Sequence, residues 1–399
     1  MVEPKASASP GAREQRHWLT DPLFRSVVFQ SLALVAMAVI AWMIVADTAA
    51  NMERQHVSVG LDFLAENTGF DLAQTLIAYS TASSIGRALF IGFLNTVLVA
   101  ILGIVFATII GLVVGIARLS TNWVISRLAT AYVEIIRNIP LLLQLFLWYF
   151  AGLGVLPEPK FSIQPVPGWV FINRRGIVFP EMLMGSATRW AVLIALVVAI
   201  AATIAVRIWA KRRQAATGQI FPIGWVGLLL IVGLPLVAFL ALGADLKLTA
   251  PRISVFNVSG GTTINPELIA MLAGLTFYTA SFIAEAVRSG ILAVSHGQIE
   301  ASKALGLSGG QTLKLVVMPQ ALRVIIPPLT NQYLNLTKNS SLAVAIGYPD
   351  LVYVGEVVFS KLGHTMEVIA LWMIIYLGTS LITSFFMNWY NRRMAIVER

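Results

Sequence analysis

The sequence predicts an all-α polytopic membrane protein with about eight transmembrane helices. Its 399 residues are 57% hydrophobic and 12% charged, whereas soluble domains are roughly half apolar and a quarter charged. The mean hydropathy is +0.80. Apolar runs of about 20 residues, long enough to cross a hydrocarbon core of about 30 Å, recur along the chain.

Composition also limits the available chemistry. The chain has no cysteine, which excludes disulfides, thiolate metal sites and a cysteine nucleophile. Its four histidines are scattered, so we expect no metal site, and no residue set suggests an enzyme or a bound cofactor. The net charge of +9 fits basic cytoplasmic loops better than nucleic-acid binding, because no basic run is interleaved with aromatic residues.

The first expected span, 27–46, follows a polar tail over 1–26. A cleaved signal peptide is the alternative, but its apolar core would be shorter. The other spans are expected at 88–116, 129–153, 190–209, 222–243, 266–287, 320–346 and 367–388. Segment 154–188, rich in proline and glycine, is expected to be largely non-helical. Segment 244–265, in which polar and β-branched residues alternate, is expected to be an extended loop.

The distribution of basic residues orients these spans. With the N-terminus in the cytoplasm, cytoplasmic segments carry 17 Lys and Arg residues and external segments carry 9, while Arg137 and Lys338 lie within spans. Basic residues concentrate in cytoplasmic loops of membrane proteins. The count therefore predicts that both termini are cytoplasmic.

The most specific pattern lies between the sixth and seventh spans. Glu300-Ala301-Ser302 is followed after three residues by Gly306, and after nine more by Val316-Val317-Met318-Pro319. The predicted orientation places this loop in the cytoplasm. A merely solvated amphipathic loop is the alternative interpretation.

The same loop contains signals for two short helices. Gly297 is expected to turn the chain off the preceding span, and Gly306 to end a first helix. Ser308 and Gln311 have the spacing of a capping box for a second helix, which Pro319 is expected to stop or kink. A helix-turn-helix element is therefore predicted.

Leu307-Ser308-Gly309-Gly310-Gln311 matches the signature pentapeptide of ABC ATPases. Nucleotide hydrolysis would also need a phosphate-cradling loop ending in Gly-Lys, and the chain contains no Gly-Lys dipeptide. We interpret the match as coincidental and expect no ATP site in this chain.

The loop resembles the EAA loop of permease subunits in bacterial ABC importers. Segments 117–120, 132–146 and 278–300 resemble the polar amino-acid branch of these permeases (the histidine, glutamate, glutamine and arginine branch). Asn138-Ile139 replaces the usual Gly-Thr before Pro140. That variant and the long insertion are most similar to the large general L-amino acid and glutamate/glutamine/aspartate/asparagine permease subunits of proteobacteria.

The resemblance implies a type I ABC importer permease core of five helices within 88–388. Around it would lie a cytoplasmic tail (1–26), an extra helix with a periplasmic loop (27–87), an insertion at about 157–265, and a cytoplasmic tail (389–399). The implied location is the bacterial inner membrane.

The resemblance also implies partners: a cytoplasmic ABC ATPase dimer that binds ATP and Mg, a second homologous permease subunit, a periplasmic amino-acid-binding protein, membrane lipid and a polar amino-acid substrate, but no nucleic acid. The family's ATPase-docking role falls on Glu300 and Gly306. The coupling loop would comprise Gly297, Gln298, Glu300, Ala301, Ser302, Gly306 and Pro319.

Polar residues in spans are costly unless they have a partner or a task. In the seventh span Pro327-Pro328 are expected to break the helix, and Asn331, Asn335 and Lys338 recur on one helical face. Candidate substrate-pathway residues are Asn331, Asn335, Lys338, Asn339, Ser340 and Ser341, with Asn95 and Thr96 as weaker candidates. Alternatively, these groups join helices or the two permease subunits.

Two structural ion pairs are expected at helical spacing, Glu134 with Arg137 and Glu285 with Arg288, with a gating role as the alternative. A different class of function, an ion-coupled carrier or channel that needs no ATPase, would predict inverted repeats and mid-membrane carboxylates. The sequence shows no convincing repeat, and its acidic residues concentrate at span ends. A purely structural scaffold would leave the EAA pattern unexplained.

Overall fold

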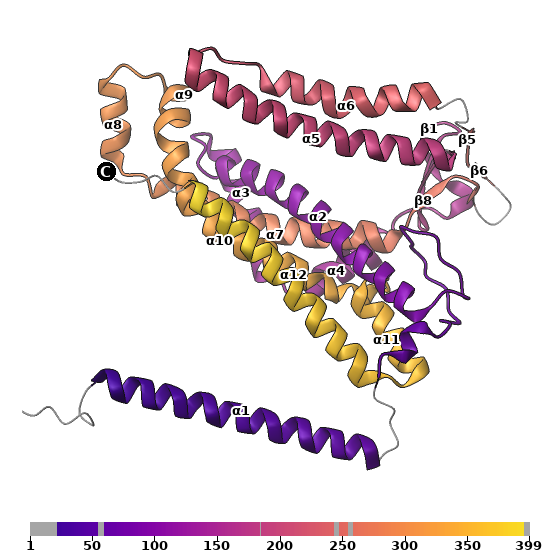
Figure 1. The fold of residues 1–399 in the computed structure, drawn as a ribbon. Helices are drawn as coiled ribbons and strands as arrows, with labels where there is room; N and C mark the ends of the chain where they lie inside the picture. The colour runs from indigo at the N-terminus through magenta and orange to yellow at the C-terminus, as the bar shows by residue number, and fades with distance from the viewer. Residues whose placement is uncertain (1–21, 55–59, 184, 243–246, 254–257, 395–399) are drawn as a thin grey trace, which may run out of the picture. The chain divides into compact units, whose positions relative to one another are not determined.

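A computed structural model describes residues 22–54, 60–183, 185–242, 247–253 and 258–394. It divides into two compact units, Met1–Phe63 and Leu64–Arg399 (Figure 1). Seven helices in the described part are long and apolar enough to cross a membrane, or eight if one bent pair counts as a span. The predicted helical membrane fold is confirmed. Most of the predicted tail over 1–26, and the last five residues of the predicted tail over 389–399, lie outside the described residues.

The first unit contains α1 (Pro22–Arg54), which includes the expected span at 27–46. Its apolar side chains are exposed, as in Trp42, which is 74% exposed. A short 3₁₀ turn, η2 (Asp62–Ala65), follows in the chain.

The core of the second unit is built on α2 (Ile85–Ala117) and α7 (Pro266–Leu292), which pack along one another. A Cβ placed at Gly111 would lie 2.5 Å from Ile283 Cγ2, and one at Gly115 would lie 2.8 Å from Val287 Cβ. Glycine at these positions lets the two backbones approach closely, as small residues do between membrane helices.

The expected third span at 129–153 is not one straight helix. The chain forms α3 (Trp123–Asn138), then α4 (Leu141–Phe146) and the π-helical η3 (Leu147–Gly152), with a bend of 108° at the break. Ile139 is extended, with φ −99° and ψ 126°, because the ring of Pro140 disfavours the helical conformation of the preceding residue. The second half rests on α7, where Trp148 stacks on Phe277.

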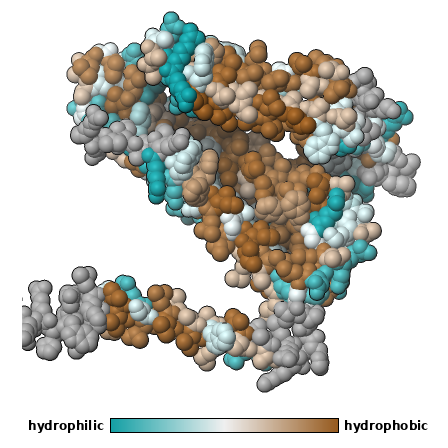
Figure 2. Space-filling model, in the orientation of Figure 1, coloured by the Kyte–Doolittle hydropathy of each residue, from teal (hydrophilic) through white to brown (hydrophobic). Residues whose placement is uncertain are grey.

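The insertion forms a helical hairpin of α5 (Ser186–Thr217) and α6 (Ile223–Leu242), which lie side by side in Figure 1. Thr188 Oγ1 donates to the Leu242 carbonyl oxygen at 3.1 Å. This hydrogen bond joins the start of α5 to the end of α6, opposite the turn of the hairpin. Figure 2 shows apolar surface along the helices, with hydrophilic residues near the turn between α5 and α6.

The two segments that flank this hairpin are non-helical, as predicted, but they pair into sheets that the sequence did not reveal. One sheet has the order β1-β2-β3-β8, with Ile177 opposite Ile264; two two-stranded sheets pair β4 with β5 and β6 with β7. The strands are β1 (Ile163–Val166), β2 (Val170–Asn173), β3 (Gly176–Phe179), β4 (Glu181–Leu183), β5 (Lys247–Thr249), β6 (Arg252–Ile253), β7 (Val258–Ser259) and β8 (Thr262–Ile264).

The expected break at Pro327-Pro328 is wrong, because α10 (Met318–Asn339) continues through both prolines. A broken helix at membrane depth would leave further backbone groups without partners. A 3₁₀ segment, η7 (Ser340–Ile346), then leads to α11 (Leu351–Leu362) and α12 (Thr365–Met394).

Asp350 caps α11 outside the spans, and its Oδ1 accepts from the Tyr353 backbone N–H at 2.8 Å. Its side chain is 0% exposed, and burial raises the pKa of this carboxyl to about 7. An acid whose pKa is higher in the folded than in the unfolded state binds its proton more tightly when the protein is folded. The free energy of unfolding therefore increases as the pH falls from the folded-state pKa toward the unfolded-state pKa.

We therefore expect the melting temperature of the purified protein to rise as the pH is lowered from 8 to 5. Asp350→Asn keeps a capping oxygen but removes the titration, so the variant should lose this part of the pH dependence. Thermal unfolding of both proteins across this range tests the expectation. Parallel pH profiles for wild type and variant would refute it.

Candidate functional site

The loop after α7 forms the expected helix-turn-helix, with α8 (His296–Ala304) followed by α9 (Gly309–Thr312). Gly306 has φ +78°, a left-handed conformation that glycine adopts without strain. The Leu307 backbone N–H donates to the Ser302 carbonyl oxygen at 3.1 Å and closes the end of α8. Ser308 and Gln311 form the capping box that their spacing predicted.

The expected turn at Gly297 and the expected stop at Pro319 are wrong. Gly297 lies inside the first turn of α8 without a positive φ; the chain leaves α7 instead at Ala293, before the N-cap Ser295. Pro319 does not stop the second helix, because the π-helical η6 (Leu313–Val317) joins α9 to α10. Pro319 directly follows this π-helical segment, in which the Met318 N–H donates to the Leu313 carbonyl oxygen.

Ser302 joins the two helices of the loop. Its side chain is buried, and Oγ donates to the Ile299 carbonyl oxygen at 2.7 Å and lies 3.0 Å from Thr312 Oγ1. Thr312, which is also buried, was not predicted from the sequence. A small polar residue ten positions after Ser302 is the only signal that could have suggested it.

The outer surface of the loop combines a carboxylate with an apolar side chain. The side chain of Glu300 is 70% exposed, with Oε1 3.1 Å from His296 Nδ1. Leu305 is 81% exposed, and Gln298 and Ala301 are also at the surface. These exposed side chains are accessible to a partner protein.

A second candidate site is the exposed face of α10. Asn331, Asn335 and Lys338 are all exposed, whereas Leu336 is buried. A Cβ at Gly103, near the middle of α2, would lie 3.2 Å from Leu336 Cδ2. Lys338 is thus near mid-membrane depth, where an ammonium group facing lipid would be costly.

Of the other candidate pathway residues, Asn95 and Thr96 lie on α2, and Asn339, Ser340 and Ser341 directly follow Lys338 in the chain. Asn95 is buried, and its Nδ2 donates to the Pro349 carbonyl oxygen at 2.8 Å; Thr96 Oγ1 accepts from the Leu351 N–H at 3.1 Å. Both hold the segment after η7 against α2, in keeping with the alternative of helix–helix hydrogen bonds. Ser340 is buried, whereas Asn339 and Ser341 are half-buried.

Of the two predicted ion pairs, Glu285 with Arg288 forms, whereas the described residues show no pair between Glu134 and Arg137. Arg288 Nη2 lies 3.1 Å from Glu285 Oε1, at the predicted spacing. Arg137 pairs with Glu285, at 3.8 Å, instead of with Glu134, because α3 places the guanidinium against α7. Arg118, at the end of α2, also donates to Glu285 and was missed by sequence reasoning limited to neighbours along one helix.

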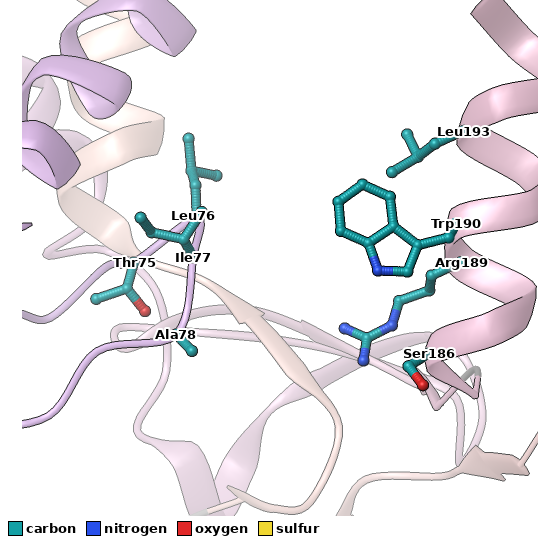
Figure 3. Close-up of a pocket in the computed structure, with 8 residues that line it drawn as sticks. All are labelled: Thr75, Leu76, Ile77, Ala78, Ser186, Arg189, Trp190 and Leu193. Atoms are coloured by element: carbon teal, nitrogen blue, oxygen red, sulfur yellow. The ribbon is translucent and has the colours of Figure 1, made fainter.

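A separate cavity of about 660 Å³ has two walls. Figure 3 shows Thr75, Leu76, Ile77 and Ala78 on one side and α5 residues, including Arg189 and Trp190, on the other. None of the sequence-predicted site residues lines it. Across the described residues, no three His, Asp or Glu side chains cluster in a way that could hold a metal ion.

The model of one protein family, described as "Binding-protein-dependent transport system inner membrane component", matches residues 103–396. The chain belongs to this family. The resemblance predicted from the EAA loop is thereby confirmed.

Three curated permeases of this family are similar to almost the whole chain. The general L-amino acid transport system permease of Rhizobium johnstonii is 49% identical over 96% of both chains. A putative amino-acid ABC transporter permease of Escherichia coli is 44% identical over 95% of this chain and 96% of its own. The glutamate/glutamine/aspartate/asparagine transport system permease of Rhodobacter capsulatus is 40% identical, with 95% and 96% coverage.

Proposed function

We propose that this chain is the transmembrane permease subunit of an ATP-driven importer for polar L-amino acids. The observation that carries the proposal is the helix-turn-helix between α7 and α10, which presents Glu300 and Leu305 on its surface. Full-length similarity to amino-acid permeases supports the substrate class. Alternating access would be coupled through this loop to a separate ATPase.

The proposal places the protein in the bacterial inner membrane with both termini in the cytoplasm. The excess of Lys and Arg in segments on that side of the predicted topology supports the orientation. The loop from α8 to α9 then faces the cytoplasm, where an ATPase is available.

The proposed partners are a cytoplasmic ATPase dimer, a periplasmic amino-acid-binding protein and a second, homologous permease subunit. ATP and Mg would be bound by the ATPase, so this chain would need no cofactor and catalyse no reaction itself. The exposed face of α10 supports a second subunit, because Lys338 at mid-membrane depth needs polar surroundings.

In this arrangement Asn331, Asn335 and Lys338 would line an aqueous path between two permease subunits. Irregular or polar surfaces at membrane depth are tolerated where they line a water-filled cavity. Amides and one ammonium group are suited to the carboxylate and amine of an amino acid.

Uptake of labelled glutamate and ATPase activity in proteoliposomes test the proposed function, with the ATPase, sister permease and binding protein present. Glu300→Ala removes a charge from the docking surface, and a charged hydrogen bond contributes about 1.5–3 kcal/mol. We expect uptake and stimulated ATPase activity to fall by roughly tenfold or more, with less ATPase co-purifying.

Glu181→Ala, a carboxylate substitution in β4 on the opposite side of the predicted topology, is the matched control and should leave both activities unchanged. Uptake that persists in Glu300→Ala, or that requires no ATPase, would favour the alternative of an ion-coupled carrier or channel.

A further inference from the structure

Three guanidinium groups converge on the single carboxylate of Glu285, near the end of α7. Arg118 and Arg288 each donate to it, and Arg137 Nη1 lies 3.8 Å from Oε2. These cationic side chains come from three different helices or helix ends. The convergence therefore depends on the tertiary fold and not on helical spacing alone.

One carboxylate cannot neutralise three cations. Glu134 lines a cavity beside this cluster, yet in the described part of the chain the structure shows no ion pair for it, because Arg137 pairs with Glu285 instead. The two arginines and two carboxylates that line the cavity balance, and Arg288, which pairs with Glu285 from outside the lining, gives the five groups one excess positive charge. Excess charge in a partly buried site favours a bound anion.

The cluster also has unused hydrogen-bonding capacity. The side chain of Arg118 is only 8% exposed, and its Nε is buried without a hydrogen-bond partner, as is Nε of Arg288. Buried donors without partners are costly and uncommon in native proteins. Because both Nε atoms are inaccessible to solvent, a ligand's acceptor would reach them only if these side chains rearranged.

A cavity of about 420 Å³ lies beside Arg118, Arg137, Glu134 and Glu285, whereas Arg288 is not part of its lining. Its volume is within the range of roughly 300–1,000 Å³ usual for small-ligand pockets. The Arg137 guanidinium lies 4.9 Å from the Phe282 ring centroid, and stacking of this kind fixes the plane of a guanidinium. The lining consists of Arg118, Val133, Glu134, Arg137, Asn138, Phe282 and Glu285.

We propose that this cavity, the arginine cavity, binds the carboxylate of an amino acid at the cytoplasmic end of the permease. The ligand class and the side of the membrane rest on the proposed function. Guanidinium groups bind carboxylates through paired, charge-assisted hydrogen bonds. Glu285 holds the arginines in place while the site is empty, and Glu134 opposes a bound anion.

The test measures binding of labelled L-glutamate by equilibrium dialysis. The permease–ATPase complex is held in phosphatidylcholine nanodiscs, without binding protein and without ATP. Arg137→Gln should weaken binding about tenfold, the loss expected for one charge-assisted contact. Glu134→Gln removes the opposing charge and should tighten binding about threefold to tenfold.

Arg127→Gln, an exposed substitution on the same helix, is the control and should bind as wild type does. Glutarate, which has carboxylates but no amine, should compete, and 1,4-diaminobutane should not. A role confined to holding helices together predicts no tightening in Glu134→Gln. Unchanged affinity in both Arg137→Gln and Glu134→Gln, or competition by the diamine alone, would overturn the proposal.

The two measurements distinguish failure of the arginine-cavity proposal from failure of the proposed function. Glutamate binding that responds to both substitutions, in a complex that shows no ATP-dependent uptake, would support the arginine cavity and contradict the proposed function. Normal ATP-dependent uptake together with binding insensitive to both substitutions would do the reverse.

Discussion

Replacing Gly111 with valine is expected to prevent α2 from packing on α7 and so to abolish the folded permease core. A Cβ at this position would lie 2.5 Å from Ile283 Cγ2 and 3.0 Å from the Ala280 carbonyl oxygen. The second contact is with backbone, so a side-chain rotation cannot relieve the clash. Overpacking typically costs about 1–3 kcal/mol, and a clash with backbone should reach or exceed the upper end of that range.

Gly378→Val on α12 is the matched control, because a Cβ there would meet no atom within 4 Å. Monodisperse yield in detergent and the melting temperature of each variant provide the measurements. We expect Gly111→Val to give little folded protein and Gly378→Val to behave as wild type does. Equal yields and melting temperatures would mean that the two helices are not in the close contact described.

The close packing of α2 could have been predicted more fully from the sequence. Gly103, Ala107, Gly111 and Gly115 recur every fourth residue, a pattern typical of close helix contacts in membranes. The sequence does not reveal which helix lies opposite the stripe. That depends on long-range packing, in which α7 contacts most of the stripe and Leu336 of α10 contacts Gly103.

Local signals predicted the coupling loop well where one residue determines the backbone. Gly306 and the Ser308–Gln311 box lie as expected, because a left-handed turn and a cap are properties of adjacent residues. Prolines were harder to interpret. Pro140 separates two helices bent by 108°, whereas Pro327 and Pro328 lie within one continuous helix, so the effect of a proline depends on the surrounding packing.

The arginine cavity could not have been predicted from the spacing of charges along the chain. Helical spacing identifies Glu285 with Arg288, but Arg118 is 167 residues from Glu285. Likewise, β3 and β8 pair across the entire α5–α6 hairpin. Contacts between residues far apart in the sequence depend on which helices and strands pack against one another. The preferences of single residues do not encode that packing.

Substitution of the exposed polar face of α10 should have the largest effect on transport itself. Lys338→Met removes an ammonium group near mid-membrane depth, and Asn335→Leu removes an amide one helical turn away on the same face. If these groups contact substrate, each loss should cost about 1.5–3 kcal/mol, or roughly tenfold to a hundredfold in uptake. Proteoliposome uptake, at equal complex assembly, measures this.

Two controls separate substrate contact from general damage. Lys338→Arg keeps the charge and should retain most uptake, whereas Lys160→Met alters an exposed lysine in the outer segment and should have no effect. Lys338→Met also removes the cost of an ammonium group within the membrane, so the variant should assemble at least as well as wild type. Reduced uptake by a well-assembled complex is therefore the result that a substrate-facing α10 predicts. If Lys338→Met and Asn335→Leu both show wild-type uptake and substrate range, this face instead contacts the second permease subunit without touching the substrate.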